Sequence, residues 1–216
     1  MDVRRLGLVP YAEAWALQNR LAEDRAAGRI PDTLLLLQHP HTYTIGRSGT
    51  RDHVYLSEAE LAARGITCLD VDRGGDVTYH GPGQLVGYPI LDLGLAPDVG
   101  AYLRGLEQCV IDVQAQFQIR AGRVERYTGV WIGDEKIAAI GVKLARGITT
   151  HGFALNVSTD LELFRHILPC GIPDKGVTSM ARQLGRAPAM PDVEDAVIDK
   201  LTSQLAPAGR RPARVA

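Results

Sequence analysis

The chain has 216 residues, a formal net charge of −1 and three cysteines. At this length it can bury roughly 70% of its unfolded surface, so a core can form without disulfides. Interspersed charges leave no basic stripe for nucleic acid, and no apolar stretch approaches the roughly 18 residues of a membrane span. Because an odd number of cysteines without a CxxC pair argues against structural zinc, we expect a cytoplasmic protein with free thiols.

The first elements expected along the chain are a helix and a buried strand. Apolar residues recur at helical spacing after Pro10, and Gly28 can end this helix. Four consecutive leucines in residues 32–38 are bounded by prolines and are too few for a buried helix, so a central strand fits best. Residues 42–46 are expected to continue the same sheet.

A short helix and another strand are expected next. Ser57 and Glu60 have the spacing of a capping box, and Gly65 can end the helix that they open. Residues 66–71 then alternate as a strand. Residues 73–84, which we call the glycine-rich segment, read Arg-Gly-Gly-Asp-Val-Thr-Tyr-His-Gly-Pro-Gly-Gln. This segment has neither GxGxxG nor GxxxxGK[ST] spacing, so it does not match a nucleotide-binding fingerprint.

The middle of the chain predicts a long helix between strands. Residues 84–93 are expected to form a strand, and Asp98 can cap the helix that follows. Residues 124–157 predict three or four strands, broken by turn signals at Gly133-Asp134 and Arg146-Gly147. The long helix should cover the sheet with one apolar stripe, made of Val99, Leu103, Leu106, Val110, Val113 and Phe117.

The C-terminal part is expected to hold two helices, a short one at residues 160–167 and a last one at residues 192–205, before a flexible tail at residues 206–216. Strands outnumber the helices that could connect parallel neighbours, so the sheet should be mixed. The fold class expected is therefore α/β of the α+β type, with a mixed β-sheet flanked by helices. One domain at residues 1–205 is the simplest organisation.

Cys170 carries the clearest chemical signal. It lies between Pro169 and Gly171, a context typical of a tight exposed turn, whereas Cys68 alternates within a strand and Cys109 lies in a helix. We expect the last two to be buried as small apolar residues. A thiol attacks carbonyl groups as the thiolate, and a thiol with an ordinary pKa near 8.5 is only a few per cent ionised at pH 7. Cys170 therefore needs a partner that favours the thiolate.

Four lysines occur in the chain, and two of them, Lys136 and Lys143, could serve as this partner. They are seven residues apart, so on one unbroken strand they point to opposite faces. Lys136 is favoured because it leads a run of small residues, ending at Gly141, that would let a ligand approach the backbone. His80 and His151 each neighbour glycine, and each could orient a substrate, act as a base or be a satisfied structural histidine.

The glycine-rich segment and three later motifs form one pattern. The segment continues to Pro89, and the later motifs are Lys136-Ile-Ala-Ala-Ile-Gly141, His151-Gly-Phe-Ala-Leu-Asn156 and Pro169-Cys-Gly171. This pattern resembles the lipoyl(octanoyl) transferases of lipoate biosynthesis, which are relatives of biotin and lipoate protein ligases. The resemblance covers about residues 30–185 and implies a ligase-type catalytic domain, a mixed sheet flanked by helices.

By this resemblance, Cys170 forms a thioester with an octanoyl group taken from acyl carrier protein, and Lys136 adjusts its protonation. The acceptors implied are lipoyl domains of 2-oxoacid dehydrogenase E2 subunits and the glycine cleavage H protein, with no cofactor and a monomeric enzyme. Lys143 stands where arginine is expected in relatives, which makes it the less suitable catalyst. The residues implied to line the acyl pocket are Arg73, Gly74, Gly75, Asp76, Val77, Thr78, Tyr79, His80, Ala139, Ile140, Gly141, Gly152, Phe153 and Ala154.

Two other functions stay open on the sequence. An ATP-dependent lipoate or biotin ligase would share the sheet and use a lysine without a thiol nucleophile, and a non-catalytic module would bind an acyl group or its carrier without forming an amide. In a transferase, a base must deprotonate the acceptor lysine, because on the order of one free amine in a thousand is neutral at pH 7. Lys136 could supply this base. His39 and His41 lack further ligands at zinc-site spacing, so no metal is expected.

Overall fold

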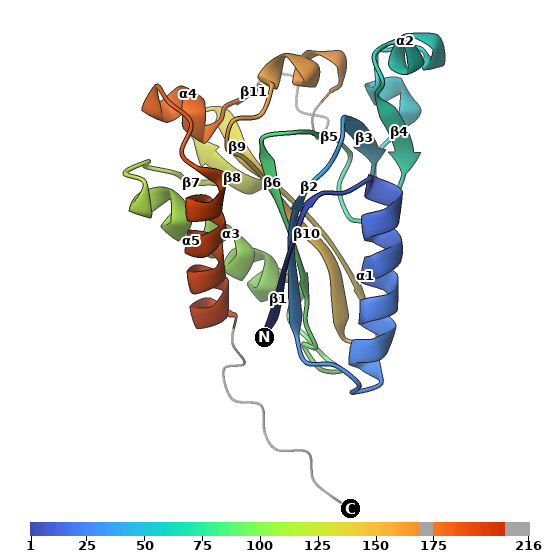
Figure 1. Cartoon of the computed structure of the whole chain (residues 1–216), viewed down its shortest axis with the longest axis vertical. Coiled ribbons are helices and arrows are strands. Elements are labelled where there is room, and N and C mark those ends of the chain that lie inside the picture. The colour runs from blue at the N-terminus through green and yellow to red at the C-terminus, as the bar shows by residue number, and fades with distance from the viewer. Residues whose placement is uncertain (169–174, 206–216) are drawn as a thin grey trace, which may run out of the picture.

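A large mixed sheet and a small second sheet organise the fold (Figure 1). The structure, a computed structural model, describes residues 1–168 and 175–205. Its strands are β1 (Asp2–Leu8), β2 (Thr33–Gln38), β3 (Thr42–Ile45), β4 (Thr67–Asp70), β5 (Val77–His80), β6 (Gln84–Ile90), β7 (Gly122–Val124), β8 (Tyr127–Ile132), β9 (Glu135–Ala145), β10 (Ile148–Asn156) and β11 (Gly176–Val177). Its helices are α1 (Tyr11–Ala26), α2 (Glu58–Ala63), α3 (Val99–Gln116), α4 (Met180–Leu184) and α5 (Met190–Gln204), with 3-10 helices η1 (Arg51–His53) and η2 (Leu161–His166).

The large sheet has the strand order β1-β2-β6-β10-β9-β8-β7, with β11 beside β9. Strands β1 and β2 pair in parallel, as do β11 and β9, and the other neighbours are antiparallel. Figure 1 shows α1 on one face of this sheet and α3 with α5 on the other. The leucines of β2 alternate between these faces, because successive side chains of a strand point to opposite sides. The predicted mixed sheet flanked by helices is confirmed.

The predicted helices form close to their expected bounds, and their caps explain why. Ser57 and Glu60 make the reciprocal capping box of α2, and the Asp98 side chain accepts from the amide of Ala101 at the start of α3. The apolar stripe predicted for α3 is partly wrong, since Val99 is 39% exposed while Tyr102 and Cys109 join the buried face. No helix within residues 1–168 and 175–205 has both the length and the apolar character that a membrane crossing requires.

Residues 42–46 do not continue the large sheet, which corrects the expectation from sequence. Strand β3 pairs instead with β4 in parallel and with β5 in antiparallel orientation, in a separate sheet of order β4-β3-β5. Pro40 lacks a backbone N–H, so the strand ladder ends there and the chain turns away. The small sheet has its own apolar cluster, which includes Tyr43, Tyr79 and Phe164.

Strand β5 lies inside the glycine-rich segment and was not predicted. Glycines on both sides of Val77–His80 obscure a four-residue strand whose neighbours in the sheet are distant in sequence. The alternation within this strand positions the functional site, because Val77 and Tyr79 enter the small-sheet cluster while Thr78 and His80 point the other way. Strands β1 and β11 and the helix α4 were also not predicted.

Two tight turns connect three successive strands of the large sheet. Gly133-Asp134 joins β8 to β9 and Arg146-Gly147 joins β9 to β10, as predicted, and residues 124–157 therefore contribute to four strands. Arg146 and Gly147 both have positive φ, at 53° and 81°, the conformation that a two-residue hairpin turn requires. The short helix expected at residues 160–167 is present as the 3-10 helix η2.

Candidate functional site

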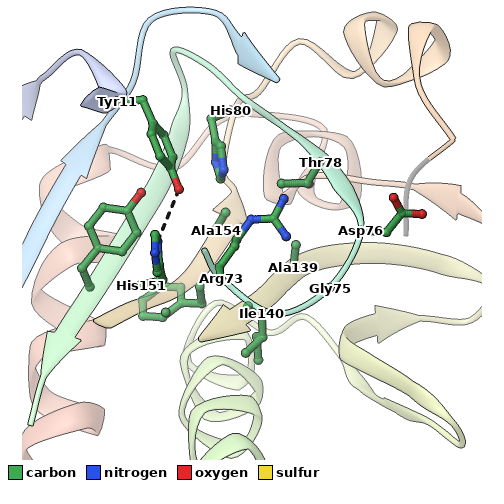
Figure 2. A pocket seen from close by; sticks show the side chains of 14 residues that line it. Tyr11, Arg73, Gly75, Asp76, Thr78, His80, Ala139, Ile140, His151 and Ala154 are labelled. Atoms are coloured by element: carbon green, nitrogen blue, oxygen red, sulfur yellow. Dashed lines mark hydrogen bonds between the residues drawn. The ribbon is translucent and has the colours of Figure 1, made fainter. Parts of the chain in front are cut away.

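A pocket lies between the small sheet and the middle of β9 and β10. We call it the main pocket; Figure 2 shows its side chains, with Tyr11, His80 and His151 toward one side and Asp76 at the opposite side. Its empty volume, open mouth included, is about 440 Å³. The residues that line it are Tyr11, Arg73, Gly75, Asp76, Thr78, His80, Tyr88, Ala139, Ile140, Gly141, His151, Gly152, Phe153 and Ala154.

A smaller hollow, the lysine pocket, adjoins the main pocket. The two share Thr78, Ala139 and Ala154 in their linings. The other lining residues of the lysine pocket are Gln84, Lys136, Asn156, Phe164 and Val177. The main pocket is therefore continuous with the hollow beside Lys136 along the paired strands β9 and β10.

Lys136 and Lys143 lie near opposite ends of β9. Lys136 is only 7% exposed, and its Nζ lies 4.7 Å from the centroid of the Trp131 ring, a distance that suits a cation–π contact. Lys143 donates to Asp72 Oδ2 at 2.5 Å and lines a separate surface hollow. Of these two lysines, Lys136 lines the hollow that adjoins the main pocket, and Lys143 does not.

The start of the glycine-rich segment is fixed against both sheets. The Arg73 guanidinium donates through Nη2 to the carbonyl and hydroxyl oxygens of Thr44 in β3, at 2.7 and 2.8 Å. The Gly74 amide donates to the carbonyl of Val142 in β9 at 2.9 Å. A Cβ on Gly141 would lie 2.9 Å from the Gly74 carbonyl oxygen, so glycine is what permits this close approach. The segment thus closes one side of the main pocket with backbone atoms.

His80 belongs to a buried hydrogen-bond network beside the lysine pocket. Its Nδ1 lies 2.8 Å from Gln84 Oε1, and Gln84 Nε2 donates to the Tyr79 carbonyl and to Asn156 Oδ1, each at 3.0 Å. Because a carbonyl only accepts, the amide orientation is set and His80 Nδ1 carries the proton. Burial lowers the pKa of His80 well below its ordinary value, so the ring is neutral and Nε2 can accept from the Thr44 hydroxyl at 3.4 Å.

His151 has an unusual backbone and two polar partners. Its φ is +56°, a left-handed conformation that costs free energy in a residue with a Cβ, and its amide donates to Gln18 Oε1 at 2.6 Å. Its Nε2 donates to Asp72 Oδ1 at 2.8 Å, and its Nδ1 lies 3.3 Å from the Tyr11 hydroxyl. Burial lowers the pKa of His151, although Asp72 opposes this effect. The neutral ring therefore accepts from Tyr11.

The structure brings most of the implied acyl-pocket residues together. Three of them do not line it: the Gly74 amide is bonded to Val142, and Val77 and Tyr79 belong to the small-sheet cluster. Cys170 lies outside the described residues. Those that line the main pocket are Arg73, Gly75, Asp76, Thr78, His80, Ala139, Ile140, Gly141, Gly152, Phe153 and Ala154.

Two residues that line the main pocket, Tyr11 and Tyr88, were not predicted from the sequence. The roles of the histidines were left open. Tyr11 is the first residue of α1 and Tyr88 lies in a buried strand, positions where an aromatic residue is expected in the core anyway. His39 and His41 do not form a joint site, because His39 bonds the Val9 carbonyl and the Tyr88 hydroxyl while His41 bonds the Tyr79 hydroxyl. Cys109 is buried as expected, and Cys68 is partly buried.

Substituting Gly152 with alanine is expected to destabilise the protein by about 1–3 kcal/mol, the usual cost of overpacking. A Cβ at this position would lie 2.2 Å from the Gly87 carbonyl oxygen and 2.7 Å from Pro89 Cδ, on the neighbouring strand. Urea denaturation of the wild type and the variant measures the change in the free energy of unfolding. Gly122→Ala is the matched control, because a Cβ on Gly122 of β7 meets nothing within 4 Å. Equal losses in both variants would contradict the packing argument.

Stability is expected to fall as the pH decreases from about 6.5 to about 4. Burial lowers the pKa of His39 to about 4, below the value of 6.5 that it regains on unfolding. Between these values the unfolded chain binds a proton that the folded chain does not, so this contribution is complete above pH 6.5 and is lost as the pH falls. His39 alone contributes about 3 kcal/mol, at 1.36 kcal/mol per pKa unit, and the lowered pKa values of His80 and His151 act in the same direction.

Urea denaturation at pH 7 and pH 4.5 measures this loss. His39→Gln is the informative variant, because its amide can donate to the Val9 carbonyl and accept from the Tyr88 hydroxyl yet does not titrate. Its stability should decline less between the two pH values, by about 2–3 kcal/mol, than that of the wild type. The same decline in both proteins would show that His39 is not responsible.

Comparisons with known proteins give one consistent result. The model of the family described as the lipoyl protein ligase A/B catalytic domain matches residues 10–202. An octanoyltransferase of Chloroflexus aggregans is 54% identical over 205 residues, which are 93% of this chain and 93% of that protein. An octanoyltransferase of Rubrobacter xylanophilus is 51% identical over 213 residues, 97% of this chain and 96% of that protein.

The fold is also found in a solved structure. A bi-partite lipoate protein ligase from Thermoplasma acidophilum superposes with a TM-score of 0.71 at 19% identity, covering 98% of this chain and 86% of that chain. At 19% identity this likeness shows the fold alone. The family relationship rests on the family model and on the relatives that are about half identical in sequence.

Proposed function

The chain belongs to the lipoyl protein ligase A/B catalytic-domain family, and from this premise we propose that it moves an octanoyl group from acyl carrier protein to the lysine of a lipoyl domain. Relatives named octanoyltransferase are about half identical over almost the whole chain, which supports this acyl group and this class of enzyme. The observation that carries the proposal is an apolar pocket that leads to a buried lysine.

In this proposal the acyl chain lies in the main pocket. Its floor is built from Ala139–Gly141 and Gly152–Ala154, short or apolar residues on two antiparallel strands whose backbone groups are already paired. Because the ladder satisfies the backbone polar groups, an apolar chain can lie on this surface without leaving a donor or acceptor unpaired. The carbonyl end would then lie toward the lysine pocket, next to Lys136.

The chemistry proposed has two halves, with Cys170 as the nucleophile. Its thiolate attacks the carbonyl carbon of the carrier thioester, the C–S bond to the carrier breaks, and the carrier leaves as a thiolate that takes up a proton. The amine of the acceptor lysine then attacks the acyl-enzyme, the amide C–N bond forms, and Cys170 leaves as the thiolate. Lys136 would favour the Cys170 thiolate as a cation in the first half and then give its proton to the departed carrier thiolate. It would therefore be neutral in the second half and could accept a proton from the attacking amine.

The partners and organisation proposed follow the same reasoning. The donor is octanoyl-acyl carrier protein, and the acceptors are lipoyl domains of 2-oxoacid dehydrogenase E2 subunits and the glycine cleavage H protein. The enzyme would act as a monomer in the cytoplasm, with one catalytic domain over residues 1–205. Because both bonds that break are thioesters, the reaction needs no nucleotide, and this distinguishes the transferase from an ATP-dependent ligase.

Mass spectrometry of the protein after incubation with octanoyl-acyl carrier protein tests the proposal. An octanoyl adduct should form without ATP, map to Cys170 after proteolysis, and disappear when a lipoyl domain is added. Cys68 and Cys109 serve as internal controls, since both should stay unmodified. Transfer that requires ATP and leaves no adduct would support a ligase instead, and carrier binding without amide formation would support a non-catalytic binding module.

A further inference from the structure

The polar end of the main pocket carries a further inference. Three side chains from three elements form this end wall: Tyr11 at the start of α1, Tyr88 of β6 and His151 of β10. They are 3%, 3% and 1% exposed. Figure 2 shows Tyr11 and His151 facing each other across their hydrogen bond, on the side of the pocket away from Asp76.

The end wall is held in place by partners outside the pocket. Tyr88 bonds His39 Nε2 at 2.8 Å, and His39 in turn bonds the Val9 carbonyl at 2.7 Å. His151 is fixed through its amide by Gln18 and through Nε2 by Asp72. Because these groups are buried and mutually hydrogen-bonded, moving one ring would break polar contacts that water cannot replace. The wall is therefore rigid where a purely aliphatic wall could repack.

The end wall is also uncharged at neutral pH. Burial raises the pKa of Tyr11 to about 12 and lowers the pKa of His39 to about 4 and that of His151 below its ordinary value. The rings are in contact here: those of Tyr11 and His39 are tilted with centroids 4.8 Å apart, and those of Tyr88 and His151 meet edge to face with centroids 6.1 Å apart. A neutral aromatic surface suits the methyl end of an acyl chain.

The register of the two strands places the wall at a set distance from the lysine. Lys136 and Val142 are six residues apart on β9, or about 20 Å at 3.3 Å per residue, and Val142 pairs with His151. The Lys136 side chain fills part of this distance at one end, and the rings of the end wall fill part of it at the other. An extended octanoyl chain measures about 9 Å from carbonyl to methyl carbon, from C–C bonds of about 1.5 Å. The space between is thus of the order of one such chain.

We infer that Tyr11, Tyr88 and His151 set the upper limit of acyl chain length in this enzyme. The inference rests on the proposed function, which places the reacting carbonyl at Lys136 and the chain in the main pocket. Longer chains would have to displace a hydrogen-bonded wall, whereas shorter chains would leave apolar surface uncovered. The three residues act by contact with the distal end of the substrate and take no part in bond making.

Transfer rates of the wild type with hexanoyl, octanoyl, decanoyl and dodecanoyl carrier protein give the first test. A rigid wall predicts a drop in kcat/KM of at least about tenfold between octanoyl and dodecanoyl, since one misfitting methylene is already worth about tenfold or more. Equal rates for octanoyl and dodecanoyl would overturn the inference while leaving the proposed function intact. Absence of octanoyl transfer would instead remove the proposed function itself.

Two variants give the second test. His151→Gly removes a ring and suits the positive φ of this position, and Tyr11→Ala removes a ring where alanine keeps the helix. Each should raise the dodecanoyl-to-octanoyl ratio of kcat/KM by about tenfold or more. Tyr102→Ala is the matched control, because Tyr102 is a buried helix tyrosine outside both pockets, and its ratio should equal that of the wild type. Unchanged ratios in both wall variants would overturn the inference.

Discussion

Replacing Cys170 with alanine is expected to lower octanoyl transfer to a lipoyl domain by at least about a thousandfold, because the proposed covalent route is lost. The acceptor amine would then have to attack the carrier thioester directly, with no acyl-enzyme to divide the reaction into two steps. Octanoylated lipoyl domain, quantified by mass spectrometry over time, measures the rate. Cys170→Ser should be similarly slow, since a serine hydroxyl is not ionised at neutral pH.

Cys68→Ala is the matched control for the loss of a thiol. Cys68 lies in β4, partly buried against the small-sheet cluster, and burial raises the pKa of its thiol. This variant should transfer octanoyl at the wild-type rate. Retention of more than a tenth of the activity in Cys170→Ala, with the control unaffected, would mean that the thiol is not the nucleophile.

Lys136→Arg is expected to lower overall transfer by about 10²–10⁴, the range associated with loss of a general base. Arginine keeps the positive charge proposed to favour the Cys170 thiolate but does not give up its proton at neutral pH. The first half-reaction should therefore survive and the second should fail, so an octanoyl adduct should accumulate on Cys170 even when a lipoyl domain is present. Mass spectrometry of the enzyme and of the lipoyl domain follows both halves separately.

Two further variants make the Lys136 experiment specific. Lys136→Met keeps the length of the side chain but removes its charge, so adduct formation should slow as well. Lys143→Arg changes a lysine of the same strand whose ion pair with Asp72 an arginine can maintain, and its transfer should stay near the wild-type rate. Undiminished turnover in Lys136→Arg would contradict the general-base role.

Local signals in the sequence account for the parts of the fold that were predicted. The capping box at Ser57, the cap at Asp98 and the turns at Gly133-Asp134 and Arg146-Gly147 each depend on a few adjacent residues, and each is present. The small sheet depends instead on pairing between β3, β4 and β5, and no local signal records which strands pair. For the same reason a strand between glycines, β5, went unrecognised.

The pocket-lining residues could be predicted where they belong to a sequence motif. They could not be predicted where a residue of the hydrophobic core also lines the pocket. Residues of the glycine-rich segment and of the β9 and β10 motifs do gather around one pocket. Tyr11 and Tyr88 have no motif of their own, and the same helical or strand pattern that buries them would bury any aromatic residue. Side chains alternate along β5, so Val77 and Tyr79 point away from the pocket. The motif implied that residues 73–80 all line the pocket, and it did not distinguish the two faces of this strand.

The main pocket lies between two sheets that each have an apolar cluster of their own. Residues such as Thr78 and His80 come from the small sheet, and Ala139 and Ala154 come from the large one. In the proposed function, a hydrocarbon seated there contacts both sheets, so it adds apolar contact at a junction that polar contacts also span, such as the hydrogen bond from Gly74 to Val142 and the ion pair of Lys143 with Asp72. A substrate bound as proposed would act as a temporary part of the interior, and each turnover would remove and restore it.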